Sequence, residues 1–404
     1  MSTSGYNNID NLLEQIFSDK DEPIDLNILF QEKLLEYDLS QRKVLGLLNI
    51  DQRTLEDTLN GTSKQPNIIN LLKIANFLGI DDLYKAIPAI LKNQEKENIA
   101  SIERGTKAAF VAKNFDIKKL NQIGFFTETD DTDYLTKRIL SFFNFNSIFE
   151  FEREVTKPLL SKTKRTHSDK MKNFWISSAS ECFKKINNPN PYERNLLKDI
   201  IVKIRPYSQD VEDGLFTVCK ALYNVGVTVI VQNHLTLTQV RGGTFFINNK
   251  PCIVLTDLNK RYTTIWETLI HEIHHVLYDL ETISGGYGFH LTGEPDLFLI
   301  EEKAENFSRE YFCGFEDYKR FKTHINSPFL IQKFAKDIEV HPSFIYSSFR
   351  HFQQAINKKN YYGAFIEFFP DYSLCIKNLS PITWKENSIN EIAEKLKSIF
   401  ELNV

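Results

Sequence analysis

Two histidines four residues apart form the pattern in this 404-residue chain that is most capable of chemistry. The segment TTIWETLIHEIHHVLYDL (263–280) contains His271, Glu272 and His275 in the order His-Glu-x-x-His. Apolar residues recur in it at spacings of three and four, which predicts a helix with one buried face. Residues i and i+4 of a helix lie on the same side, so the two imidazoles can converge on one metal ion.

This spacing is typical of zinc peptidases. Two neutral imidazoles and a third protein ligand hold Zn²⁺ and leave a fourth position for water, whose pKa the metal lowers toward about 7. A carboxylate beside the first ligand can take the proton of that water and pass it to the leaving amine. We therefore expect His271 and His275 to bind zinc and Glu272 to act as the general base. Mn²⁺ is an alternative metal because such ligands accept several divalent ions.

The third ligand is expected on a second helix, IEEKAENFSREYF (300–312), which has an apolar face of its own. Twenty-five residues lie between His275 and Glu301, enough for a helix end, a glycine-rich loop and a return. Glu301 is the first choice as ligand, and Glu302 is the alternative. Glu305, one turn after Glu301, is placed to hydrogen-bond a ligating histidine.

A small sheet is expected just before the metal helix. TVCKALYNVGVTVIVQNH predicts a helix and then a strand over 225–231. RGGTFFINNKPCIVLTD predicts a glycine turn followed by two strands, at 244–247 and 252–256.

These segments together resemble the ImmA/IrrE family of metallopeptidases. The family pattern is a glycine turn, a strand, an arginine, the His-Glu-x-x-His helix and a Glu-x-x-Ala helix. The matching positions are Arg261, His271, Glu272, His275, Glu301, Ala304 and Phe307. The resemblance implies a zinc endopeptidase that cuts a protein partner, typically a repressor or antitoxin, in stress response, toxin–antitoxin systems or phage-related defence.

Several positions depart from the family pattern or stay open. His274 stands where the family usually has Gly, Glu305 replaces a common Asn or Asp, and Ser308 replaces Ala. His274 would alter substrate access or compete as a ligand, although at this position it points away from the line between the two ligating histidines. His341 is either a transition-state stabiliser, as in some family members, or a helix cap. No role is assigned to four other histidines, His234, His290, His324 and His351.

The N-terminal part predicts three short helices. Ser40 is expected to cap a helix over 41–48, Asp51 a second over 52–59, and a third spans 68–78. This stretch resembles the helix-turn-helix domains of the xenobiotic-response-element and phage-repressor family. The resemblance implies DNA-binding roles for three residues, Gln52 and Arg53 in the major groove and Gln41 near the backbone.

Charge argues against strong DNA binding by this part. Residues 25–85 contain seven Lys or Arg and nine Asp or Glu, whereas phosphate contacts require a positive face. A helical domain for dimerisation or partner docking is therefore the alternative. The most basic stretch of the chain, 157–172, is interpreted as a solvated face rather than a nucleic-acid or acidic-partner patch.

Composition limits the class of protein. With 42% apolar and 25% charged residues the chain is an ordinary globular protein, which excludes disordered and collagen-like classes. A net charge of −4 provides no general basic field for nucleic acid. Five widely spaced cysteines without a C-x-x-C pair indicate reduced thiols. No signal peptide or membrane-length apolar run is recognisable, so we expect a cytoplasmic protein without membrane contact.

We therefore predict an α+β protein in which an all-α helix-turn-helix domain precedes a zincin-like metallopeptidase domain with a small sheet. The expected regions are an extension (1–24), the helix-turn-helix domain (25–90), a linker and helical middle region (91–195), the peptidase domain (196–330) and a C-terminal region (331–404). A homodimer is possible. The rival function is a DNA-binding regulator or sensor whose metal site is structural or inactive.

Overall fold

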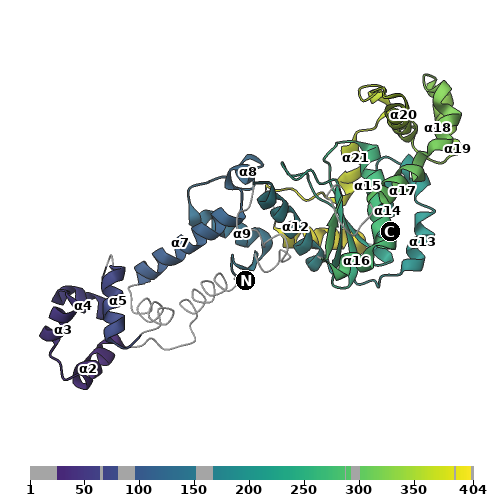
Figure 1. Cartoon of the computed structure of the whole chain (residues 1–404). Coiled ribbons are helices and arrows are strands. Elements are labelled where there is room, and N and C mark those ends of the chain that lie inside the picture. The colour runs from purple at the N-terminus through teal and green to yellow at the C-terminus, as the bar shows by residue number, and fades with distance from the viewer. Residues whose placement is uncertain are drawn as a thin grey trace. The chain divides into compact units, whose positions relative to one another are not determined.

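The computed structural model describes residues 25–63, 67–80, 96–151, 167–286, 288–292, 301–385 and 388–401. The chain divides into two compact units, residues 1–109 and 110–404 (Figure 1). Most of the described residues are helical and one mixed sheet has four strands, so the predicted α+β class is confirmed. The predicted extension 1–24 and most of the basic stretch 157–172 lie outside the described residues.

Between residues 25 and 80, the described part of the N-terminal unit contains four short helices. They are α2 (Leu26–Glu36), α3 (Gln41–Leu48), α4 (Gln52–Leu59) and α5 (Ile68–Phe77). The predicted N-caps are confirmed: Ser40 accepts a hydrogen bond from the backbone N–H of Lys43, and Asp51 accepts one from that of Thr54. Phe30, Val44 and Leu55 are buried in a hydrophobic cluster that belongs to these helices. α7 (Lys96–Asn114) crosses the boundary between the two units.

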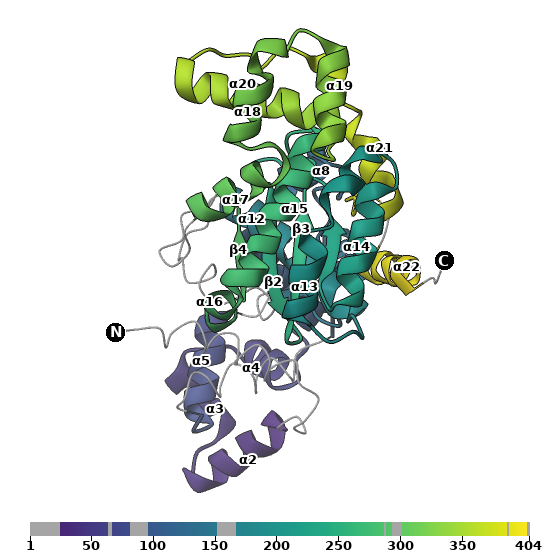
Figure 2. The same cartoon turned by 90° about the vertical axis from the view of Figure 1, so that its right-hand side faces the viewer.

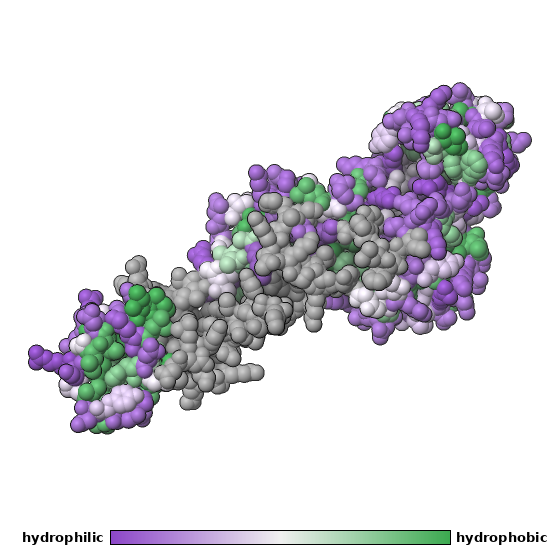
Figure 3. Space-filling model, viewed as in Figure 1, coloured by the Kyte–Doolittle hydropathy of each residue, from purple (hydrophilic) through white to green (hydrophobic). Residues whose placement is uncertain are grey.

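Apolar side chains also reach the surface of this unit. Figure 3 shows apolar surface on the N-terminal helices. Leu35 of α2 is 83% exposed, and the other large apolar side chains there that are more than half exposed are Ile28, Leu47, Ile68 and Ile69.

The second unit is built around the sheet. Its strands are β1 (Thr228–Val231), β2 (Gly242–Ile247), β3 (Lys250–Leu255) and β4 (Phe289–Leu291), in the spatial order β1-β3-β2-β4. β1 runs parallel to β3, and β2 runs antiparallel to both β3 and β4. Asn248 and Asn249 join β2 to β3 with positive φ angles of 53° and 60°, which suit a tight two-residue hairpin turn.

The predicted glycine turn is wrong, because Gly242 and Gly243 are the first two residues of β2. These glycines are required by close packing. A Cβ on Gly242 would lie 2.5 Å from Cγ2 of Thr268 and 2.9 Å from Oε1 of Glu272, both on the helix that covers the strand. The strand and the helix can approach so closely only because Gly242 has no side chain.

Gly242→Ala is therefore expected to lower the free energy of unfolding by about 1–3 kcal/mol, the usual cost of overpacking a core. Gly285→Ala is the matched control, because a Cβ there meets no atom within 4 Å. Urea unfolding of the two variants beside the wild type measures the difference. Equal stability of all three proteins would contradict the close packing.

The helix that contains the His-Glu-x-x-His pattern and a second helix cover opposite faces of the sheet (Figure 2). α15 (Tyr262–Tyr278) packs against β2 and β3, and α12 (His167–Ile186) packs against β2. Neighbouring residues of a strand face opposite sides. Accordingly, Thr244 contacts Glu272 of α15, whereas Phe245 packs against Trp175 of α12. Because successive side chains of β2 face opposite sides, polar Thr244 lies on the α15 side of the sheet and aromatic Phe245 lies on the α12 side.

The remaining helices complete this unit. They are α8 (Ile117–Gln122), α9 (Thr132–Phe143), α13 (Arg194–Ile201), α14 (Gly214–Asn224), α16 (Leu280–Gly285), α17 (Glu301–Cys313), α18 (Phe315–Phe321), α19 (Pro328–Asp337), α20 (Pro342–Asn357), α21 (Tyr372–Ile376) and α22 (Ile389–Glu401). Within the described ranges of this unit, four short 3₁₀ helices accompany them, Arg205–Gln209, Lys322–His324, Ile366–Phe368 and Lys377–Leu379. None of the helices in the described ranges is both long and apolar enough to cross a membrane.

The middle and C-terminal regions share one core with the sheet. A single hydrophobic cluster runs from Phe110 to Phe400, and α12 packs against α22. Residues 110–404 form one compact unit, so the regions predicted as 196–330 and 331–404 and most of 91–195 lie within it. The physical reason is that α12 must cover the second face of the sheet. Two phenylalanine pairs, 125–126 and 142–143, are buried in this core.

Candidate metal centre

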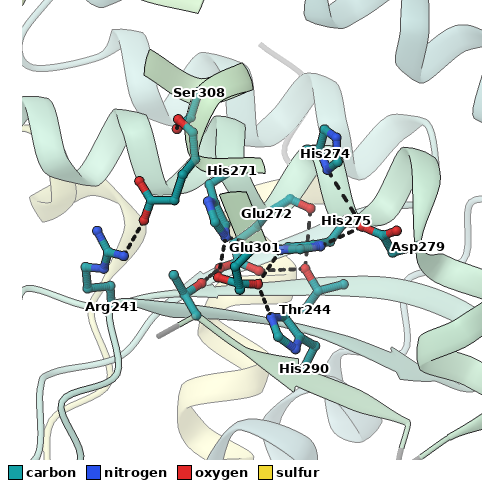
Figure 4. Close-up of polar contacts among 12 residues, drawn as sticks. Arg241, Thr244, His271, Glu272, His274, His275, Asp279, His290, Glu301 and Ser308 are labelled. Carbon is teal, nitrogen blue, oxygen red and sulfur yellow. Dashed lines mark hydrogen bonds and ion pairs between the residues drawn. The ribbon is translucent and has the colours of Figure 1, made fainter. Parts of the chain in front are cut away.

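Three side chains from two helices converge on one point (Figure 4). His271 and His275 lie on consecutive turns of α15, and Glu301 is the first residue of α17. Nε2 of His271 lies 3.1 Å from Nε2 of His275. Oε2 of Glu301 lies 3.4 Å from Nε2 of His271, and Oε1 of Glu301 lies 3.2 Å from Nε2 of His275. The structure thus brings together the three residues predicted as ligands.

These separations fit a tetrahedral zinc ion. Ligand atoms about 2.0–2.1 Å from zinc lie about 3.4 Å from one another at the tetrahedral angle. The two Nε2 atoms lie 3.1 Å apart, and the nearest Glu301 oxygen lies 3.2 Å from Nε2 of His275 (Oε1) and 3.4 Å from Nε2 of His271 (Oε2). Two imidazoles and one carboxylate are also a ligand set of catalytic zinc sites, which keep one position open.

The choice between the two adjacent glutamates follows from the direction of α17. Glu301 faces the histidines, whereas Glu302 is exposed and belongs to no cluster of potential ligands among the described residues. Consecutive helical residues point about 100° apart, so both cannot reach the same ion. Glu301 is therefore the candidate third ligand.

Asp279 supports one of the histidines. Its Oδ2 lies 2.8 Å from Nδ1 of His275, one turn earlier on the chain. A carboxylate behind a ligating histidine fixes the ring and leaves Nε2 free to face the metal. The predicted partner, Glu305, does not take this role: it forms ion pairs with Arg241 and Arg309 instead. Glu305 lies one full turn beyond Glu301, which carries it past the histidines to the arginines.

Asp279→Asn is expected to weaken zinc binding about 10–100-fold, the usual effect of losing such a supporting carboxylate. The amide retains the size of the side chain but gives up the charge. Competition titration with a chromogenic zinc chelator measures the affinity. Glu281→Gln is the control, since Glu281 is a nearby exposed carboxylate. Unchanged affinity in Asp279→Asn would show that His275 needs no support.

His290, to which no role was assigned, lies against the site. Its Nε2 is 2.6 Å from Oε1 of Glu301. Pairing of β2 with β4 explains this position, because His290 is the direct partner of Thr244 and so faces α15 as Thr244 does. The alternation in Phe-His-Leu-Thr (289–292) is a weak signal for this edge strand. His290 orients the carboxylate of Glu301.

The electrostatics of the cluster favour a cation between these groups. Burial alone raises the pKa of Glu301, but hydrogen bonds to His271, His275 and His290 bring that pKa well below its usual range. Burial likewise lowers the pKa of His275, yet hydrogen bonds to Asp279 and Glu301 and the nearby charge of Glu272 raise it to about 10. Both shifts show that positive charge is stabilised between the carboxylates.

Glu272 is fully buried and held at both oxygens. The hydroxyl of Thr244 donates to Oε2 at 2.7 Å, and the hydroxyl of Thr292 donates to Oε1. Thr244 faces α15 from β2, and Thr292 directly follows β4, two residues after His290 and on the same side. The threonines fix the carboxylate beside the first ligand of the metal helix, and sequence reasoning missed both of them.

His274 lies off the main cluster. Its ring packs near Tyr278 and Phe307, and its Nδ1 is 3.7 Å from Oδ2 of Asp279. His274, His275 and Asp279 form a second group of potential ligands. In this group the nitrogen of His275 nearest to Asp279 is Nδ1, and the two atoms lie 2.8 Å apart. That is the distance of a direct hydrogen bond, which occupies both atoms. The group that contains His271 is therefore the candidate metal site.

His341 caps a helix. Its Nδ1 accepts a hydrogen bond from the backbone N–H of Ser343 in the first turn of α20. The ring also packs against Tyr262, at the start of α15. His271 lies nine positions after Tyr262, which is roughly 14 Å along the helix axis. Burial lowers the pKa of His341 to about 4, so the ring is neutral near pH 7. These contacts favour the capping role over that of transition-state stabiliser.

The predicted DNA-binding residues lie around the α3–α4 turn. Gln52 and Arg53 are exposed on the first turn of α4, and Gln41 is half-buried at the start of α3. Each of the first two contacts an acidic residue one turn later: Gln52 donates to Glu56 at 2.7 Å, and Arg53 lies 3.5 Å from Asp57. Acidic neighbours weaken attraction to phosphate.

No family model, curated protein or solved structure matches this chain. The function must therefore be argued from the geometry of the site.

Proposed function

We propose that the protein is a zinc-dependent endopeptidase. One observation carries the proposal: Nε2 of His271 and Nε2 of His275 lie 3.1 Å apart and each lies within 3.4 Å of one carboxylate oxygen of Glu301, with Glu272 next to His271 on the same helix. Structural zinc sites usually have four protein ligands, whereas three ligands and a neighbouring carboxylate are typical of hydrolytic centres.

When bound, zinc lowers the pKa of water and polarises a carbonyl group. Residues of the chain transfer the proton and hold the ligands in position. Glu272, whose orientation is fixed by Thr244 and Thr292, takes a proton from the attacking water and delivers it to the leaving amine. Asp279 and His290 hold the rings and the carboxylate of the ligands in place.

The substrate class is proposed on separate grounds. The resemblance to ImmA/IrrE metallopeptidases supports a protein substrate such as a repressor or antitoxin. Exposed apolar side chains on the N-terminal unit, including Leu35 and Ile69, are suited to docking a protein partner.

The test is a search for new protein N-termini. Zinc-loaded protein is incubated with a lysate of its host, and newly formed N-termini are compared with those produced by chelator-treated protein. A peptidase generates a small set of cleavage sites that depends on zinc and returns when zinc is restored. An identical set of N-termini with and without zinc would overturn the proposal.

A second candidate is a DNA-binding regulator with a structural metal. It is favoured by the α3–α4 pair, whose three-residue connection and exposed Gln52 and Arg53 suit a helix in the major groove. Its test is the salt dependence of binding to random duplex DNA, since each phosphate contact steepens the fall of affinity with salt. A flat salt response would remove this candidate.

A further inference from the structure

A second feature of the C-terminal unit lies beside the metal centre: a cavity of about 460 Å³ rich in arginine. α15, α17, α20 and the segment 360–369 form its walls. Its four arginines are Arg241, Arg261, Arg309 and Arg350. A smaller cavity of about 40 Å³ shares Arg241 and Arg309 with it and reaches the imidazole of His271. The two cavities therefore adjoin.

Two of the arginines have no acidic partner. Arg241 and Arg309 both pair with Glu305. Arg261 and Arg350 form no ion pair with any residue that the structure describes, and their Cζ atoms lie 3.9 Å and 5.1 Å from the ring centre of Tyr362. Burial and the charge of Arg261 lower the pKa of Arg350. Two like charges are thus held together at one ring.

One donor of this pair has no acceptor. Nη2 of Arg350 is buried and makes no hydrogen bond within the described part of the chain. Leaving a buried charged donor unsatisfied is costly. An anion inside the cavity would provide the acceptor that Arg350 lacks.

The charges of the lining indicate how negative that anion is. Four arginines contribute +4 and Glu305 contributes −1. Burial raises the pKa of Glu267 to about 7, so it contributes between 0 and −1 near neutral pH. Burial and Arg309 lower the pKa of His351, which is therefore neutral. The surplus is +2 to +3. A single carboxylate would balance one charge, whereas a phosphate monoester carries about −1.5 to −2 at pH 7.

Five aromatic side chains also line the cavity, together with threonine, serine, cysteine, glutamine and asparagine residues. Its aromatic residues are Phe312, Phe344, Tyr361, Tyr362 and Phe369. Such rings offer flat apolar surface for a ring of the ligand. The volume falls within the range of about 300–1,000 Å³ that is usual for small-molecule sites.

We propose that this cavity binds a small phosphate monoester that carries a flat ring, the chemistry of a nucleoside monophosphate. Arg261 and Arg350 hold the phosphate, because guanidinium groups pair well with phosphate oxygens. The aromatic wall holds the ring. This binding does not require peptidase activity.

The test is calorimetric titration of the zinc-loaded full chain with adenosine monophosphate, inorganic phosphate and adenosine. We expect one equivalent of the monophosphate to bind, phosphate to bind more weakly and adenosine to bind least. Arg350→Met should weaken monophosphate binding about 10–100-fold, the usual effect of losing a hydrogen bond to a charged group. Arg320→Met, at an exposed arginine of α18, should leave the affinity unchanged.

Three outcomes would overturn the proposal. The first is no binding of either phosphate compound by the folded wild type. The second is binding that survives Arg350→Met but is lost with zinc, which would place the phosphate on the metal. The third is tighter, Arg350-dependent binding of an aspartate-containing peptide, which would assign the cavity to a substrate carboxylate. Arg261→Met replaces Arg350→Met if circular dichroism shows that the latter is unfolded.

Discussion

Glu272→Gln is expected to lower the rate of peptide-bond hydrolysis about 10²–10⁴-fold, the usual contribution of a general base. The amide has nearly the shape of the carboxylate but cannot accept a proton. Glu272 is not among the candidate metal ligands, so the zinc content should stay at about one equivalent. The variant therefore separates chemistry from metal binding.

The surroundings of Glu272 suggest that the variant folds. Thr244 and Thr292 donate to the two carboxylate oxygens, and a hydroxyl group can accept as well as donate. One threonine can therefore rotate its hydroxyl and accept from the new amide nitrogen. We expect a loss of stability of about 1 kcal/mol, comparable to one altered hydrogen bond.

The measurement combines initial cleavage rates on a substrate identified by its new N-terminus with elemental analysis of each protein. Glu302→Gln is the matched control, because Glu302 is an exposed carboxylate beside the third ligand. Wild-type cleavage by Glu272→Gln would assign the proton transfer to another group. Loss of zinc from that variant would instead mean that Glu272 takes part in holding the metal.

Local signals were sufficient for two N-terminal helices and for the helix that carries two of the predicted ligands. Helices 41–48 and 52–59 have the predicted bounds, because Ser40 and Asp51 cap them with their own side chains. The metal helix was expected over 263–280 and spans Tyr262–Tyr278. In each case the spacing of apolar residues belongs to one short segment, and for the two N-terminal helices the capping residue belongs to it as well, whereas Arg261, the N-cap of α15, makes no side-chain capping hydrogen bond.

The residues that surround the ligands required tertiary information. His290 reaches Glu301 because β4 pairs with β2, whose Thr244 lies 46 positions earlier. A three-residue edge strand has too few alternations to be recognised from its sequence. Gly242 was taken for a turn because glycine marks both turns and close backbone approach. Asp279 was within reach of sequence reasoning, since it lies four residues after His275 on the same helix face.

Removal of zinc is expected to lower the melting temperature of the C-terminal unit by about 8–16 °C. Zinc at 1,000 times its dissociation constant adds about 4 kcal/mol to stability. A domain of 150–250 residues loses about 2–4 °C per kcal/mol, and this unit of residues 110–404 is somewhat larger. Without the ion, Glu301, His271 and His275 lose the ligand bonds that compensate for their burial. The folded state is then less stable.

Calorimetry of the full chain measures this effect, first with chelator and then with zinc restored. His275→Ala should show the lower melting temperature even with zinc present, whereas His324→Ala, at an exposed histidine, should respond to zinc as the wild type does. All three ligands belong to residues 110–404, so the transition of the N-terminal unit should not move. A zinc-dependent shift in that transition would place a metal outside the site of His271, His275 and Glu301. An unchanged transition of the C-terminal unit, together with no zinc in the purified protein, would remove the basis for a zinc peptidase.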